Sequence, residues 1–219
     1  MINKNKDQRV VVLVDVQNLY YSAKNLFDAK VNFGHVLEDI VSGRKLIRAL
    51  AYVIRAEVGK EAAFFEALES AGFDIREKDL QVFVGGAKKG DWDVGIAMDA
   101  IRYASKADSI ILVSGDGDFV PLVQYLKIAK GCIVELVAFD KTCSSDLKDE
   151  VDSFLDLESN KKRYLIQNKK SRTTRSAKQS TSKSVVSNKL RSSQKSSDLT
   201  KRTSTKAGRK ISTNSRSAK

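Results

Sequence analysis

The sequence is poor in the residues that indicate a disulfide scaffold or a zinc site. It has two cysteines, Cys132 and Cys143, one histidine, His35, and one proline among 219 residues. Two cysteines without Cys-x-x-Cys spacing exclude a disulfide framework, so we expect reduced thiols in or near the core. His35 has no partner at metal-ligand spacing, and we expect it at the surface of a loop.

Long hydrophobic runs are also missing. No stretch approaches the roughly 20 apolar residues needed to cross a bilayer, and the first ten residues, MINKNKDQRV, lack the apolar run of a signal peptide. These absences favour a cytoplasmic protein without membrane contact. The sequence is compatible with a homo-oligomer.

Positive charge is concentrated at one end of the chain. Residues 159–219 carry 19 Lys and Arg and a single acid, a net charge of +18. The remaining 20 basic and 26 acidic residues leave residues 1–158 at a net −6. Apolar periodicity stops near residue 159, where Ser, Thr, Lys and Arg dominate and no core can form. We therefore predict a folded domain over 1–158 and a disordered basic tail over 159–219.

The folded part alternates strands and helices. Continuous apolar runs, RVVVLV at 9–14, SIILVS at 109–114 and CIVELVAF at 132–139, are typical of strands buried on both faces. We predict further strands at 46–54, 73–77 and 81–84, and helices at 60–71, 92–107, 119–130 and 144–156. The alternation predicts an α/β fold, a parallel sheet with helices on both faces.

Two acids follow buried strands in the sequence. Asp15 ends the first strand, and Asp116 follows the strand at 109–114. Ligands of such sheets bind at the carboxyl ends of the strands, so both acids fall at the predicted ligand edge. Glycines on either side of Asp116 permit a tight turn. Asp118 fits as the N-cap of the next helix, and Pro121 fits that helix's first turn.

A third acidic group lies in the segment KKGDWDVGIAMDA. Asp91 could cap the helix there, with Asp93 in its first turn. Asp93 and Asp99 are six residues apart, roughly 240° of rotation and ~9 Å of rise, so they cannot face one ion in the same way. Asp93 is therefore the better candidate ligand, and Asp99 is a peripheral one.

Clustered carboxylates repel one another, and a divalent cation removes that conflict. Oxygen ligands without His or Cys suit Mg²⁺ or Mn²⁺, which activate water and stabilise charge during phosphodiester cleavage. A single Asp at a strand end is more often a turn former or a cap. Three acidic groups at one predicted edge are harder to explain by turns alone.

Three segments resemble the signature segments of NYN-domain proteins, above all the LabA-like branch of the PIN-like nuclease superfamily. They are VLVDVQNLYYS, KGDWDVGIAMDAI and ILVSGDGDFVPLVQYLK, in the family's order and spacing over residues 9 to about 140. The resemblance implies a PIN-like parallel sheet, a carboxylate-bound Mg²⁺ or Mn²⁺, and RNA cleavage by activated water.

The family's functional residues fall on particular positions of this chain. The resemblance places metal ligands at Asp15, Asp93, Asp116 and Asp118, a supporting polar residue at Asn18, and a further acid at Asp99. The family usually has one residue between its Lys-Gly and Asp-Val pairs, and this chain has two. Asp91 could therefore replace or assist Asp93 at that position.

Basic and aromatic residues are candidates for contacts with RNA. Lys89 is about as well explained by a solvated loop as by a phosphate contact. Trp92 could stack on a base, although a lone Trp at a helix start more often packs into the core. The tail should bind phosphates without sequence preference; its first lysines and arginine are Lys161, Lys162, Arg163, Lys169 and Lys170.

Two functions follow from these observations. The first is a metal-dependent endoribonuclease acting on single-stranded RNA. The alternative is a non-catalytic RNA-binding or regulatory module that keeps the acids as a relic or as a weak metal site. A phosphatase should read Asp-x-Asp after the first strand, whereas this chain reads Asp15-Val16-Gln17.

Overall fold

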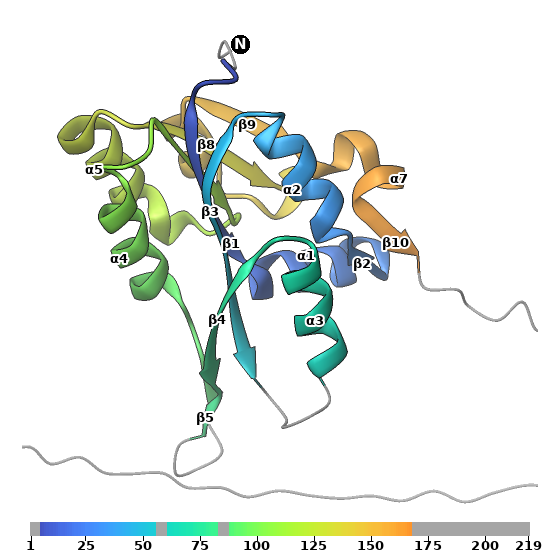
Figure 1. The fold of residues 1–219 in the computed structure, drawn as a ribbon. Helices are drawn as coiled ribbons and strands as arrows, with labels where there is room; N and C mark the ends of the chain where they lie inside the picture. The colour runs from blue at the N-terminus through green and yellow to red at the C-terminus, as the bar shows by residue number, and fades with distance from the viewer. Residues whose placement is uncertain (1–4, 56–60, 83–87, 168–219) are drawn as a thin grey trace, which may run out of the picture. The chain divides into compact units, whose positions relative to one another are not determined.

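The computed structural model describes residues 5–55, 61–82 and 88–167, with only the backbone at 81, 82, 88 and 89. A six-stranded, all-parallel sheet in the order β4-β3-β1-β7-β8-β9 forms its centre (Figure 1). The strands are β1 (Arg9–Asp15), β3 (Lys45–Arg55), β4 (Asp74–Asp79), β7 (Ser109–Val113), β8 (Ile133–Ala138) and β9 (Ser153–Asp156). This arrangement confirms the predicted α/β fold.

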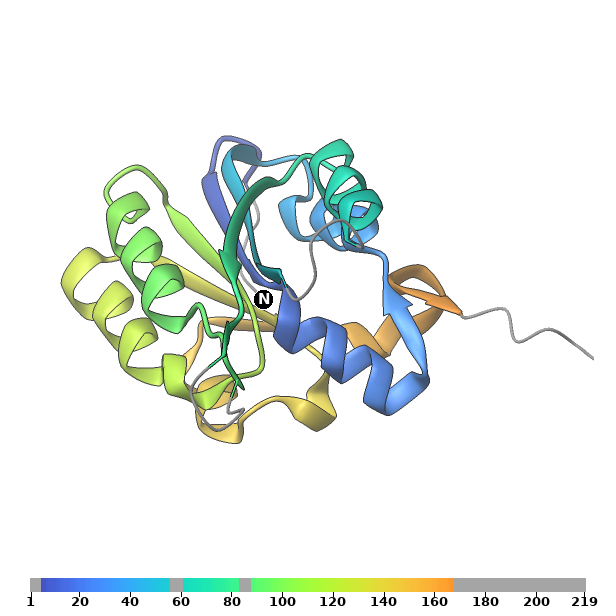
Figure 2. The same cartoon turned by 90° about the horizontal axis from the view of Figure 1, so that it is seen from below.

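Helices cover both faces of the sheet, as Figure 2 shows. On one face lie α1 (Val16–Phe27), α2 (Phe33–Val41) and α3 (Ala62–Ser70), which share a core with alternate residues of β1 and β3. On the other face lie α4 (Asp93–Tyr103), α5 (Val120–Lys130) and α6 (Ser145–Glu150). No helix in the described part of the chain is long and apolar enough to cross a membrane.

The central strands are apolar because both of their faces are buried. In β1, Val10 and Val12 pack into the α1–α3 core, and Val11 and Leu13 pack into the α4–α6 core. Burial on alternating sides explains the unbroken run of valines. Since all six strands are parallel, their carboxyl ends meet at one edge of the sheet.

Two small antiparallel pairs complete the fold. One joins β5 (Gln81–Val82) to β6 (Lys88–Lys89). The other joins β2 (Ala29–Val31) to β10 (Leu165–Gln167), which follows the short helix α7 (Lys161–Tyr164). The predicted start of the tail at residue 159 is therefore wrong for 159–167. Residues 168–219, with Lys169 and Lys170, and residues 83–84 of a predicted strand lie outside the described residues.

Two further predictions need correction. The expected helix over 144–156 ends at Glu150, and the chain continues as strand β9, because Asp152 accepts a hydrogen bond from the Val134 backbone N–H at 2.8 Å and brings this segment beside β8. His35 is exposed as expected, but it lies in helix α2 rather than in a loop. Cys132 is buried and free, and Cys143 is free and half-buried.

Candidate metal centre

Asp15 lies where β1 ends and α1 begins. It is the N-cap of α1, and its carboxylate accepts a hydrogen bond from the Asn18 backbone N–H at 3.0 Å. Its second oxygen accepts a longer bond, 3.4 Å, from the hydroxyl of Ser114. This bond to the N–H three residues on is the usual one for a helix cap, and any residue but proline at position 18 could make it.

Asn18 connects this helix start to the neighbouring strand. Its side-chain oxygen accepts a hydrogen bond from the Gly115 backbone N–H at 3.0 Å. Ser114, which the sequence analysis did not single out, also accepts a bond from the Asp116 N–H at 3.3 Å. Asn18 and Ser114 therefore tie the ends of β1 and β7 together, and they position Asp15 and Asp116 relative to each other.

Asp116, rather than Asp118, is the capping residue after β7. Its carboxylate accepts a hydrogen bond from the Asp118 N–H at 3.0 Å and caps the short 3-10 helix Gly117–Phe119. Helix α5 follows with Pro121 in its first turn, as predicted, but without a side-chain cap. The prediction that Asp118 caps this helix is wrong, and its carboxylate is exposed at the edge of the sheet.

The glycines beside Asp116 are needed for packing against the loop after β8. A Cβ at Gly115 would lie 2.8 Å from the Thr142 carbonyl oxygen, and one at Gly117 would lie 2.9 Å from the Ser144 hydroxyl. Both distances are shorter than real Cβ contacts allow. The loop of residues 142–144 therefore holds the turn that carries Asp116 and Asp118.

Trp92 anchors the start of α4. Its indole N–H donates to the Val53 carbonyl at 2.8 Å, and its ring packs on Tyr52 with centroids 5.4 Å apart. Trp92 thus packs into the domain, which is the more common role of a lone Trp at a helix start. It is also the N-cap position of α4, so Asp91 does not cap the helix, and Asp93 lies in the first turn.

The carboxylates of Asp93, Asp116 and Asp118 come together at the carboxyl edge of the sheet. One oxygen from each lies within 4.8 Å of the others. Two oxygens bound to one Mg²⁺ at 2.0–2.1 Å are at most about 4.2 Å apart, so small side-chain rotations bring the three to a common ion. This all-oxygen donor set fits Mg²⁺ or Mn²⁺.

Asp15 borders this group without being part of it. Burial, followed by the charges of Asp93 and Asp116, raises the pKa of Asp15 above its usual range, while the Asn18 N–H acts in the opposite direction. Burial and the charges of Asp116, Asp91 and Asp118 likewise raise the pKa of Asp93. The four predicted ligands therefore form one electrostatically coupled acidic cluster.

Asp99 has a different role from the one its peripheral position in the motif indicated. It is buried, and it accepts hydrogen bonds from the Tyr52 hydroxyl at 3.0 Å and from Arg102 at 2.5 Å. Arg76 Nε lies 3.7 Å from the same carboxylate. Burial and the adjacent Asp99 strongly raise the pKa of Tyr52. Asp99 therefore fixes α4 against β3 and β4.

The predicted tail lysines near residue 160 belong to the folded domain. Arg163 binds Asp39 of α2 with two bonds of 2.6 Å, and the Lys161 ammonium lies 4.6 Å from the centroid of the Phe27 ring. Lys162, in the same short helix, is exposed. Lys89 falls in β6, and its side chain lies outside the described part of the structure. Arg163 and Lys161 therefore contact α2 and α1 of the domain itself.

Comparison with known proteins identifies the family. The NYN domain model matches residues 9–158, more than half of the chain. This chain belongs to the NYN domain family. A relative, the low amplitude and bright protein LabA of Synechococcus elongatus, is 25% identical over 163 residues, covering 69% of this chain and 85% of LabA. The crystal structure of a Vibrio parahaemolyticus protein of unknown function superposes with a TM-score of 0.68 at 30% identity. That comparison covers 75% of this chain and all of the other.

Proposed function

We propose that this NYN domain protein is an endoribonuclease that depends on Mg²⁺ or Mn²⁺ held by Asp93, Asp116 and Asp118, with Asp15 beside them. The observation that supports this most directly is the meeting of three carboxylates from two separate segments at the carboxyl edge. Asp116 and Asp118 lie on one turn that the loop of residues 142–144 holds in place, which keeps the cluster together despite its repulsion.

Each polar residue of the cluster has a definite task in this proposal. When bound, the cation would activate water and stabilise charge that develops on the phosphodiester. Asn18 and Ser114 hold Asp15 through bonds of 3.0 Å and 3.4 Å to Asn18 N and Ser114 Oγ. Asp116 orients Asp118 through its backbone N–H. RNA as the substrate is inferred from family membership, and single strands are favoured because their backbone reaches an open edge most easily.

A regulatory RNA-binding module remains the alternative function. The name of the Synechococcus relative refers to low amplitude and brightness and to no reaction. The two proposals differ in whether RNA is turned over. We further propose a cytoplasmic location, because the two free cysteines suit a reducing compartment.

The test is cleavage of an end-labelled single-stranded RNA by the full chain, with Mn²⁺ or with EDTA. Asp116→Asn keeps the oxygen that caps Asp118 and removes the charge. Asp7→Asn, an exposed acid paired with Lys45 at 2.8 Å, is the matched control. We expect metal-dependent cleavage by the wild type and by Asp7→Asn, and none by Asp116→Asn. Equal inertness of all three proteins with equal RNA binding would favour the regulatory module.

A further inference from the structure

We call the strip of surface between β4 and α4, from Lys78 near the acidic cluster to Arg48 and Tyr103, the groove. Strand β4 is one of the two edge strands of the sheet, and α4 begins at Asp93 and runs back toward the amino end of the strands. The two elements are joined along their length. At the acidic end Lys78 of β4 donates to the Asp91 carbonyl at 2.7 Å, and further along Arg76 lies 3.7 Å from Asp99.

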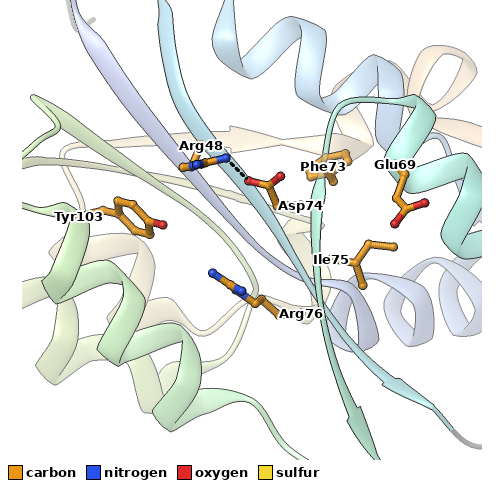
Figure 3. A pocket seen from close by; sticks show the side chains of 7 residues that line it. All are labelled: Arg48, Glu69, Phe73, Asp74, Ile75, Arg76 and Tyr103. Carbon is orange, nitrogen blue, oxygen red and sulfur yellow. Dashed lines mark hydrogen bonds and ion pairs between the residues drawn. The ribbon is translucent and has the colours of Figure 1, made fainter.

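The far end of this groove opens into a hollow of about 580 Å³. Figure 3 shows Arg48, Asp74, Arg76 and Tyr103 around this hollow on the α4 side of β4. Tyr103 belongs to the end of α4, and Arg48 belongs to β3. The hollow therefore continues the groove that starts at the acidic cluster.

Cations recur along the floor of the groove. Arg76 and Lys78 are two residues apart on β4, so they share a face at a spacing of about 6.6 Å. Arg48 and Arg102 border the same groove from β3 and α4. Asp74 and Asp99 face these four cations, and Glu69 also lines the hollow. The groove thus carries four basic and three acidic side chains, on a domain whose residues 1–158 sum to −6.

Arg48 and Arg76 are exposed enough to exchange their ion-pair partners for a phosphate. Arg48 contacts Asp74 at 2.9 Å, but their side chains are 54% and 50% exposed. Arg76 is 45% exposed and has only the 3.7 Å approach to Asp99 among the ion pairs of the described residues. Exposed pairs of this kind contribute little, and guanidinium groups bind phosphate with two parallel hydrogen bonds.

We propose that this groove binds the phosphodiester backbone of the RNA strand that leads out of the acidic cluster, with Lys78, Arg76 and Arg48 contacting successive phosphates and Tyr103 available to stack on a base. The proposal rests on the proposed function for its ligand. It also answers an electrostatic difficulty, because acids alone would repel RNA, and a row of cations beginning next to Asp93 offsets that repulsion.

The test measures binding of the full chain to a fluorescent oligouridylate by anisotropy, in EDTA, over a series of KCl concentrations. Arg76→Gln/Lys78→Gln is compared with Arg9→Gln/Lys45→Gln, which removes an exposed, ion-paired arginine and lysine from the amino edge of the sheet. We expect the slope of log Kd against log[KCl] to fall by about 1.4 in the groove variant and to be unchanged in the control. Asp74→Asn, which releases Arg48, should tighten binding.

Equal slopes in the two double variants would overturn the proposal, since net charge or the basic tail would then explain the binding. Because EDTA removes turnover from the measurement, the result is independent of catalysis. A wild type that cleaves RNA while the two slopes agree would refute the groove and keep the ribonuclease. A wild type that never cleaves RNA while the slopes differ would refute the ribonuclease and keep the groove.

Discussion

Acidic side chains have opposite kinds of neighbour at the two edges of the central sheet. At the amino edge, Glu135 is buried with Arg44, and Ser109 adds a hydrogen bond of 2.6 Å to the same carboxylate. Asp108, nearby, binds Arg9 through both side-chain and backbone N–H groups. At the carboxyl edge, Asp93, Asp116 and Asp118 face one another instead.

The difference shows up in the proton affinities. The hydrogen bond and charge of Arg9 lower the pKa of Asp108, whereas burial and like charges raise the pKa of Asp15 and Asp93. An acid that is paired stabilises the folded state, and an acid that is crowded by its own kind weakens it. The crowded acids at the carboxyl edge thus lower the stability of the fold, and a cation bound between them can restore it.

The largest effect should come from breaking the pairing at the amino edge. Glu135→Ala leaves the Arg44 guanidinium buried without its partner carboxylate, which typically destabilises a fold by about 3–5 kcal/mol. Urea denaturation followed by circular dichroism measures the change.

The control for this prediction is Arg44→Met/Glu135→Ala, which removes both charges. It should recover much of the lost stability, because the penalty arises from an uncompensated buried charge. If the double variant were as unstable as Glu135→Ala, the loss would come from packing and not from the unpaired charge.

The next largest effect is the stabilisation of the fold by a cation bound at the carboxyl edge. A ligand that binds only the folded state stabilises it by mass action, about 2.7 kcal/mol at a hundred times its Kd. We therefore expect Mn²⁺ at that excess to raise the melting temperature by roughly 5–10 °C over that in EDTA. Asp93→Asn should lose most of this shift, and Asp7→Asn, at the amino edge, should keep it. An equal shift in both variants would place the cation elsewhere.

A smaller effect of opposite sign should follow from the same substitution without metal. In EDTA, Asp93→Asn removes a charge that Asp116, Asp91 and Asp118 repel, so the fold should become more stable. The gain should stay below about 1 kcal/mol, because Asp93 is only half-buried and solvent screens the repulsion. Differential scanning calorimetry measures it. A lower melting temperature of Asp93→Asn in EDTA would show that the carboxylate is needed for the fold itself.

Where the sequence was sufficient, a local pattern had a single physical reading. The apolar runs around Val12 and Ile111 had to be buried on both faces, and the rule for parallel strands then brought Asp15 and Asp116 to one edge. Helix α2 could have been read from the sequence too. Its buried residues Phe33, Val36, Leu37 and Ile40 have helical spacing after the cap Asn32.

Where the sequence was insufficient, contacts between distant residues decided. Strand β10 forms because Leu165 pairs with Val31, and Arg163 joins it to Asp39, more than a hundred residues earlier. Local composition gives no sign of these partners. The turn that carries Asp116 and Asp118 likewise packs, through Gly115 and Gly117, against the distant loop of residues 142–144.

The smallest effect, the pH dependence of stability in EDTA, should separate the two edges in one titration. The folded-state pKa of Asp15 and Asp93 is raised, so their unfavourable contribution is present above that pKa and is lost as the pH falls through it. The pKa of Asp108 is lowered, so its favourable contribution is present above the ordinary value of about 4 and is lost at lower pH. The melting temperature should therefore rise slightly as the pH falls from neutral toward about 4, and it should drop below that.

Asp15→Asn/Asp93→Asn should remove the rise and keep the drop, whereas Arg9→Gln should weaken the drop and keep the rise. A rise that survives in the double variant would mean that acids outside the cluster cause it, and the contrast between the edges would then lose its electrostatic basis.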